Sequence, residues 1–176
     1  MKAAVFSDSH GETSLMIEAL RRTRPDAIIH LGDHDRDAVE LRHAFPEIPL
    51  YSVCGNCDIM PLAPARDTVQ LGPVKAFITH GHLYSVKFGR VDSLVYAAME
   101  AGAKIALFGH THGGQVNFFG YSPFANLSPG VGSRYLSGWL EENRAAILVS
   151  NGVGTSGFPV RVFAPPQVHL ITLKSR

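Results

Sequence analysis

The sequence predicts an α/β fold, and three observations lead to that prediction. Short apolar runs at residues 3–6, 27–31 and 50–53 are separated by helix-like stretches. Two further strand-like runs, 68–71 and 74–79, meet at Gly72-Pro73 as in a β-hairpin. A buried run at 104–108 follows the last amphipathic stretch. Because strands that alternate with helices form βαβ units around a parallel sheet, we expect one α/β domain over residues 1–176, with a mixed sheet or two sheets.

Three helices are expected between these strands. The first begins near Thr13 or Ser14, either of which could cap it, and the other two cover 38–45 and 91–99. Each is ended by a proline or a glycine that follows it closely. Beyond residue 109 the chain is rich in Gly, Ser, Pro and aromatic residues, and its strand candidates are 115–119, 145–149, 160–163 and 168–173.

Composition narrows the class of protein. The 176 residues are 45% hydrophobic and 18% charged, as in globular domains that bury a core of their own. The formal net charge of +1 gives no reason to expect nucleic-acid binding. No apolar run is long enough to cross a bilayer, and the first residues become polar too soon for a signal peptide. With two cysteines and so no disulfide framework, the chain is expected to be cytoplasmic.

Polar residues that can bind metal ions follow five strands in succession. They are Asp8-Ser9-His10, Gly32-Asp33-His34-Asp35, Gly55-Asn56-Cys57-Asp58, His80-Gly81-His82 and Gly109-His110-Thr111-His112. In an open α/β sheet, ligands bind outside the carboxyl ends of the strands. Residues i and i+2 of an extended chain face the same way, so each Asp-x-His or His-x-His can point both side chains into one pocket. Since Asp, Asn and His are donors that manganese, iron and zinc accept, the pattern predicts a metal site.

These motifs resemble those of the calcineurin-like metallophosphoesterases, and most closely the compact YfcE-type phosphodiesterases. The family pattern is Asp-x-His, Gly-Asp, Gly-Asn-x-Asp, His-Gly-His and Gly-His-x-His, and residues 1–112 match each motif in order. The resemblance implies a four-layer αββα sandwich, with two mixed β-sheets flanked by helices. It also implies a dinuclear metal site at the carboxyl ends of the strands.

The resemblance further implies which residues bind the metal ions. One ion would be bound by Asp8, His10 and His112, with Asp33 bridging to a second ion. The second ion would be bound by Asn56, His80 and His110, and the Asn56 amide could also orient the phosphate. The ions would be divalent, with Mn²⁺ first and Fe, Zn, Ni or Mg as alternatives. A hydroxide that bridges them would attack phosphorus in line with the leaving oxygen.

The residue that protonates the leaving group stays open. The larger family usually has a histidine where this chain has Cys57, which here precedes Asp58. Cys57 could act as the acid itself, or His82 or His34 could replace it. We rank His82 first because it follows the expected ligand His80 by two residues, although it could instead orient that ligand. A redox role for the Cys-x-x-Cys at 54–57 is disfavoured, since no clear helix begins there.

The chain beyond residue 112 resembles a different branch, the often membrane-associated metallophosphoesterases that act on lipid-type phosphodiesters. Residues 113–116 and 150–161 carry this second resemblance. The loop at 152–157 could pass close to the phosphate with Arg161 as an anion contact, or it could be a tight turn between strands. Aromatic residues from Phe118 to Tyr135 and Trp139 are interpreted as a lid or a homo-oligomer contact rather than a membrane-facing patch, because no basic cluster accompanies them.

The resulting prediction is a metal-dependent phosphodiesterase that acts on a small-molecule substrate and has no transmembrane segment. A phosphomonoesterase of the same fold is the first alternative. A non-catalytic scaffold like the retromer subunit of this fold is the second. It is disfavoured because such scaffolds lose metal ligands, whereas this chain keeps every expected donor.

Overall fold

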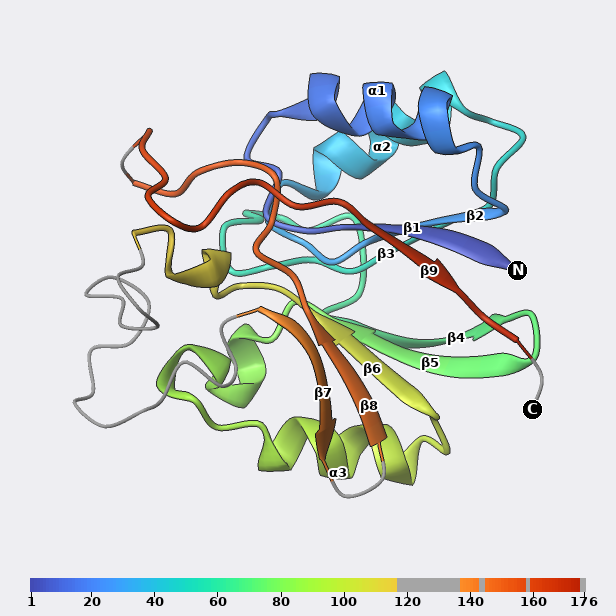
Figure 1. Ribbon diagram of the computed structural model, residues 1–176, viewed down its shortest axis with the longest axis vertical. Coiled ribbons are helices and arrows are strands. Elements are labelled where there is room, and N and C mark those ends of the chain that lie inside the picture. The colour runs from blue at the N-terminus through green and yellow to red at the C-terminus, as the bar shows by residue number, and fades with distance from the viewer. Residues whose placement is uncertain (117–136, 143–144, 158, 175–176) are drawn as a thin grey trace.

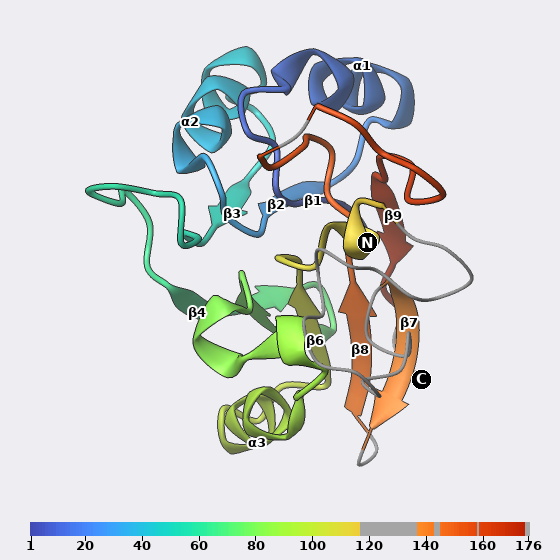
Figure 2. The ribbon, with the colours of Figure 1, turned by 90° about the vertical axis from the view of Figure 1, so that its left-hand side faces the viewer.

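Two β-sheets packed face to face form the centre of the protein, and helices cover the outer face of each (Figure 1). The computed structural model spans residues 1–176 and describes all of them except 117–136, 143–144, 158 and 175–176. Figure 2 shows the layers end on, with α1 and α2 on one side and α3 on the other. The predicted αββα sandwich is therefore confirmed.

The first sheet is built from the N-terminal βαβ units. Its strands lie in the order β3 (Leu50–Ser52), β2 (Ala27–His30), β1 (Lys2–Phe6) and β9 (His169–Thr172). The first three are parallel and β9 is antiparallel to β1. Helices α1 (Thr13–Thr23) and α2 (Asp35–Ala44) make the connections between the parallel strands. All of β2 is buried, as expected of a strand covered on both faces.

The second sheet contains the hairpin and the later strands. Its order is β4 (Arg66–Leu71), β5 (Val74–Thr79), β6 (Ile105–Phe108), β8 (Ala145–Val149) and β7 (Gly138–Glu142). The central three strands are parallel, and both edge strands are antiparallel to their neighbours. Helix α3 (Asp92–Glu100) covers the outer face. Three short 3₁₀ helices lie at His82–Tyr84, Val86–Phe88 and His112–Gly114.

Alternation along the strands explains the layers. Ala3 and Val5 of β1 belong to the core between the sheets, whereas Ala4 and Phe6 pack with the residues of α1 and α2. Successive side chains of a strand point to opposite faces, so one apolar run supplies two cores. On the other side, Phe108 packs beneath α3.

Two helix starts differ from the sequence prediction. Neither Thr13 nor Ser14 caps α1, because Glu12 occupies the N-cap position and makes no side-chain cap. Helix α2 begins three residues before the predicted residue 38. The cause is a distant carboxylate: Oδ1 of Asp58 accepts the N–H groups of His34 and Asp35 at 2.8 Å each. These donors have no partner within the helix, and a negative charge at a helix N-terminus is favourable.

One strand prediction was wrong, a second is tested only at its first two residues, and one strand was missed. Residues 160–163 form no strand, and of 115–119 only Gln115 and Val116 are described. Gln115 ends a 3₁₀ helix, and Val116 pairs with Val162 in an isolated bridge. Strand β7 was not predicted, because its Gly-Trp-Leu-Glu-Glu sequence lacks a continuous apolar run. Trp139 lies on this edge strand with 52% of its surface exposed, while Phe118 and Tyr135 lie outside the described residues.

Candidate metal centre

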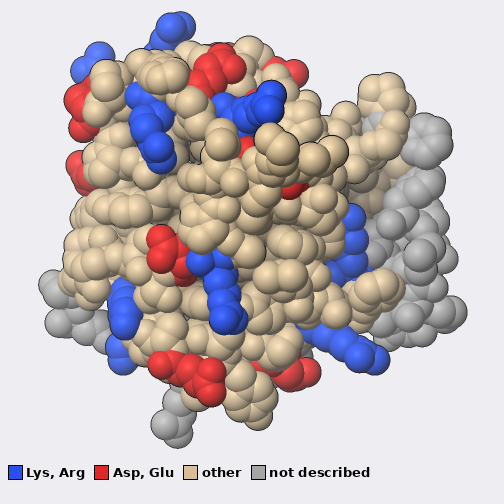
Figure 3. Space-filling view, turned by 180° about the vertical axis from the view of Figure 1, so that it is seen from behind, with Lys and Arg blue, Asp and Glu red and all other residues tan. Residues whose placement is uncertain are grey.

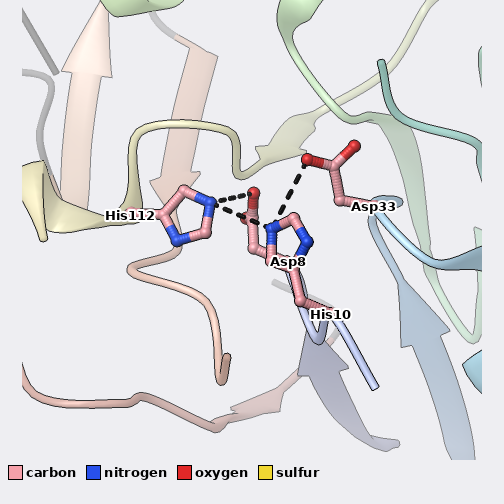
Figure 4. Close-up of side chains that lie close together, drawn as sticks. All are labelled: Asp8, His10, Asp33 and His112. Carbon is pink, nitrogen blue, oxygen red and sulfur yellow. Dashed lines mark hydrogen bonds and ion pairs between the residues drawn. The ribbon is translucent and has the colours of Figure 1, made fainter. Parts of the chain in front are cut away.

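The predicted metal ligands lie where strands of both sheets end. Asp8 and His10 follow β1, Asp33 follows β2, and His80 follows β5. His110 and His112 follow β6 and complete the set. Figure 4 shows Asp8, His10, Asp33 and His112 pointing toward one another from these separate strand ends. The position agrees with the rule that sites in α/β sheets lie beyond the carboxyl ends of strands.

Side chains of six of these residues form two groups that share one member. The first group is Asp8, His10, Asp33 and His112, and the second is Asp33, His80 and His110. Within each group the candidate ligand atoms all lie within 4.8 Å of one another. Asp33 is the shared residue, with Oδ1 3.4 Å from Nε2 of His80 and Oδ2 3.7 Å from Nε2 of His10. Each oxygen of one carboxylate thus faces a different group.

The polar atoms of the centre point toward one another but do not satisfy all of one another's hydrogen-bonding capacity. A metal ion needs donor atoms arranged in this way. Oδ2 of Asp8 accepts hydrogen bonds from the Ser7 hydroxyl and from the His110 N–H. Oδ1 of Asp8 is buried and has no hydrogen-bond partner in the part of the chain that the structure describes, although Nε2 of His112 lies 3.1 Å away. An unpaired buried carboxylate oxygen is costly, and a cation would remove that cost. The residues present therefore fit a bound divalent ion.

His80 is held in the tautomer that a metal ligand needs. Its Nδ1 lies 2.8 Å from the backbone oxygen of Leu31, which can only accept, so Nδ1 carries the proton. Nε2, 3.0 Å from Nδ1 of His110, is then the nitrogen that would offer its lone pair to a metal ion once the ring is neutral. A backbone carbonyl behind a ligating imidazole fixes the orientation of the ring and makes it a better donor.

Electrostatics keeps the two carboxylates ionised. Burial alone would raise the pKa of Asp8, but the charges of His112 and His80 outweigh burial and hold that pKa well below its usual range. Burial likewise acts to raise the pKa of Asp33, and the hydrogen bond and charge of His80 lower it further than burial raises it. Both groups can therefore act as anionic ligands at neutral pH.

The backbone is strained at the candidate ligands. Positive φ angles occur at Asp8 (50°), His10 (46°), Asp33 (58°), His110 (70°) and His112 (53°). Residues other than glycine adopt this left-handed region at a cost and do so mainly where function demands it. These strained backbone positions are ones whose side chains converge. The placement of these side chains is therefore kept at a cost in backbone conformational energy.

The loop after β3 contacts Asp33 through its backbone. The N–H of Cys57 donates to Oδ1 of Asp33 at 3.0 Å, and a Cβ on Gly55 would lie 2.0 Å from the same oxygen. Asn56 is exposed, and its Nδ2 lies 3.3 Å from Sγ of Cys57. Asp58 accepts three backbone N–H groups, from His34, Asp35 and Gly55, and so ties this loop to α2. This geometry favours a structural contribution by Asp58.

Two proton-donor candidates, Cys57 and His82, lie beside the second group, and the third, His34, lies beside the first. Burial and the Asp33 carboxylate raise the pKa of Cys57 to about 12, so its thiol stays protonated. The His82 ring is tilted against His80 and edge-on to His110, with ring centroids 5.5 and 6.2 Å away. Its Nδ1 is buried and has no hydrogen-bond partner among the described residues. Burial and the charge of His80 lower the pKa of His82. His34 contacts His10 edge to face at 5.3 Å.

Three residues that contact the candidate ligands or their neighbours were not among the site residues predicted from the sequence: Ser7, Ser9 and His30. Ser7 bonds Asp8, and Ser9 donates from Oγ to the backbone oxygen of Asp33 at 3.2 Å. Fully buried His30 lies behind Ser9, with Nε2 2.9 Å from that Oγ. The signal that could have found the serines is their alternation with the ligands, since Ser-Asp-Ser-His follows a buried strand directly.

The metal-free protein is expected to lose stability as the pH falls from about 7 toward 5. Burial and the charge of His80 lower the pKa of His110 to about 3, and burial also lowers the pKa of His10, His30, His82 and His169. The unfolded chain protonates these rings first, from about pH 6.5 downward, so acid favours unfolding. His80 acts oppositely, because its pKa is raised and its contribution is lost as the pH rises.

Urea unfolding in chelating buffer at several pH values measures this balance. The midpoint should fall steadily below about pH 6.5, because five rings with a lowered pKa outweigh the one with a raised pKa. A midpoint that rises on acidification would contradict the balance.

The surface and the helices add two observations. Figure 3 shows acidic and basic side chains interspersed on the face that it draws, without a large area of one sign. Within the described residues, no helix has the length and apolar character needed to span a membrane.

Comparison with known proteins agrees with this centre. The model of the calcineurin-like phosphoesterase superfamily domain matches residues 1–130. The Bacillus subtilis (strain 168) protein named "Probable metallophosphoesterase YsnB" is 36% identical over 115 residues, which are 64% of this chain and 64% of that protein. The chain thus spans less than two thirds of the length of this curated relative.

Solved structures share the fold. A predicted phosphoesterase from Streptococcus pneumoniae TIGR4 superposes with a TM-score of 0.64 at 27% identity, covering 91% of this chain and 77% of its own. Vps29 from Entamoeba histolytica in complex with Zn²⁺ has a TM-score of 0.65 at 16% identity, with 98% and 86% covered. An archaeal phosphodiesterase has a TM-score of 0.56 at 17% identity, with 98% and 100% covered.

The family model covers the five motif groups and the strands that carry them. Its match extends over well more than half of the chain, and the converging Asp and His side chains lie within it. The chain therefore belongs to the calcineurin-like phosphoesterase superfamily, whose members are metal-dependent.

Proposed function

We propose that the chain is a phosphodiesterase that hydrolyses small phosphodiesters with two divalent metal ions. Mn²⁺ is the first candidate, and Fe, Zn, Ni or Mg ions are alternatives that the same N and O donors accept. The observation that carries the proposal is the position of Asp33, which belongs to both groups of converging side chains. One ion would be held by Asp8, His10, Asp33 and His112, and the other by Asp33, Asn56, His80 and His110.

Two bound divalent ions would lower the pKa of a shared water and stabilise charge on the attacking and leaving oxygens. The chain itself supplies the geometry. Asp33 belongs to both groups of side chains, and the Leu31 oxygen fixes the orientation of the His80 ring. The exposed Asn56 is placed to orient a phosphate oxygen through its amide. His82 and Cys57 lie beside the second group, where a proton could pass to the leaving oxygen.

Charge balance supports a diester over a monoester. Two divalent ions, opposed by the carboxylates of Asp8 and Asp33 and by the attacking hydroxide, would leave the centre with one net positive charge. A diester brings one negative charge, which suits that balance, whereas an ionised monoester brings up to two. The archaeal phosphodiesterase of the same fold points the same way.

Removing the metal tests the proposal directly. Purified protein freed of metal should not hydrolyse an aryl phosphodiester, and added Mn²⁺ should restore turnover that a chelator then stops. We expect kcat/KM for an aryl diester to exceed that for the matching aryl monoester by about tenfold or more, about 1.4 kcal/mol. A higher kcat/KM for the monoester than for the diester would identify the protein as a phosphomonoesterase instead. Protein that binds metal without hydrolysing either ester would favour the scaffold alternative.

A further inference from the structure

The segment that follows β8 lies directly on the ends of β1 and β6. The N–H of Ser150 donates to the Phe108 oxygen at 2.9 Å, and the N–H of Val153 donates to the Ser7 oxygen at 3.0 Å. The N–H of Gly154 then donates to the oxygen of Asp8 at 2.9 Å. A Cβ on Gly154 would lie 2.1 Å from the Ser9 oxygen, so only glycine permits this approach. We call residues 150–157 the brace.

Arg161 joins the brace to His112. Its Nε donates to the Gly154 oxygen at 2.9 Å, and Nη2 donates to the Asn151 oxygen at 2.9 Å and also to Gly154. Nη1 donates to the His112 oxygen at 3.1 Å and to the Ala164 oxygen at 2.9 Å. Nη2 also lies 3.4 Å from Nδ1 of the His112 ring.

These contacts bear on the anion contact that the sequence analysis considered for Arg161. A guanidinium has five N–H donors in a rigid fork. Here that fork is occupied by backbone oxygens of four residues, so an anion could reach it only by displacing them. The guanidinium instead fixes the backbone of His112, and lies beside its ring, relative to the strand end that carries Asp8.

We propose that Arg161 is the positioning residue of the first metal group, the one containing Asp8, His10 and His112. This inference rests on the proposed function, since it takes both groups to be metal sites. The brace holds the backbone of Asp8 and Arg161 holds His112, whereas the contacts of Arg161 among the described residues do not include His80 or His110. Loss of Arg161 therefore weakens one metal site and spares the other.

Metal titration in single-site backgrounds tests this selectivity. His110→Ala leaves the first group as the intact one, and His10→Ala leaves the second. In the His110→Ala protein, adding Arg161→Gln should weaken Mn²⁺ binding by about 10- to 100-fold, the usual cost of losing a residue that orients a ligand. In the His10→Ala protein the same change should leave the Mn²⁺ affinity within about threefold. Calorimetry gives the affinities, and electron paramagnetic resonance counts free Mn²⁺.

Two further variants sharpen the comparison. Arg161→Lys keeps the cation but not the fork, so it should recover part of the lost affinity. Arg22→Gln removes an exposed arginine of α1, whose partner is Glu18 at 3.5 Å, and should alter neither site. Where circular dichroism shows that Arg161→Gln does not fold, Arg161→Lys is titrated in both backgrounds instead, and weakening confined to the first group again supports the proposal.

The outcomes separate this inference from the function on which it rests. Equal loss at both sites, or no loss at either, would overturn the positioning role of Arg161. Wild-type protein that binds fewer than two Mn²⁺ ions would overturn the dinuclear site itself, whatever the Arg161 variants do.

Discussion

Asp33→Asn is expected to lower kcat/KM for a phosphodiester by about a thousandfold or more, equivalent to about 4 kcal/mol of transition-state stabilisation. The substitution keeps the shape of the side chain but removes its charge and one of its two oxygen donors. In the wild type, Oδ1 faces His80 at 3.4 Å and Oδ2 faces His10 at 3.7 Å. Asparagine can offer an oxygen to one group only, so the bridge is lost.

Measuring the number of bound metal ions together with the kinetics would show why Asp33→Asn loses activity. We expect the Asp33→Asn protein to bind fewer Mn²⁺ ions than the wild type under the same conditions. Asp67→Asn is a matched control, because Asp67 is an exposed carboxylate on β4. It should change neither turnover nor metal content. Near-normal turnover of Asp33→Asn with two bound ions would show that Asp33 does not bridge.

His82→Asn is expected to produce a loss that depends on the leaving group. For a diester with an alkyl alcohol as leaving group, kcat should fall by about a hundredfold, a typical contribution of general acid catalysis. For an aryl diester, whose leaving group needs little protonation, kcat should change by less than about threefold. The buried Nδ1 of His82 lacks a partner and the ring lies against His110. Its location suits proton transfer at the second group.

The competing donor is Cys57, and the same substrate pair decides between them. General acids work best with a pKa near the working pH, and the pKa of Cys57 is raised to about 12. Cys57→Ala should therefore have a smaller effect than His82→Asn on the alkyl diester. His43→Asn, on the exposed side of α2, is the matched histidine control. If only Cys57→Ala shows a loss that depends on the leaving group, Cys57 and not His82 is the general acid. If His82→Asn binds metal more weakly, His82 is instead a positioning residue.

Local sequence was enough to predict the strands that carry the centre. Ala3 to Phe6 and Ala27 to His30 are apolar throughout except for His30, and both are strands in the structure. Asp8 and Asp33 follow them within three residues, so a strand-end position could be read from the chain alone. The same logic failed at residues 160–163. Their apolar residues suggested a strand, but Val162 makes only one bridge and Phe163 is 79% exposed.

Contacts between distant segments determined what local pattern could not. Helix α2 begins early because Asp58 supplies a cap from 23 residues away. The Arg161 guanidinium donates to carbonyl oxygens of residues 112, 151, 154 and 164, a set of contacts that no local pattern predicts. A short apolar run or an Asp-x-His motif consists of residues that are close together in the sequence, so it can be recognised from the sequence alone. Which side chain completes a distant helix, and which backbone oxygens surround a guanidinium, depend on how the two sheets stack.

The candidate metal centre lies between these cases. The identity and order of Asp8, His10, Asp33, His80, His110 and His112 are read directly from the sequence. Their division into two groups with Asp33 in common requires strands of both sheets to end at one place. Residues up to 104 positions apart meet there, because burial of the apolar faces of both sheets brings the strand ends together.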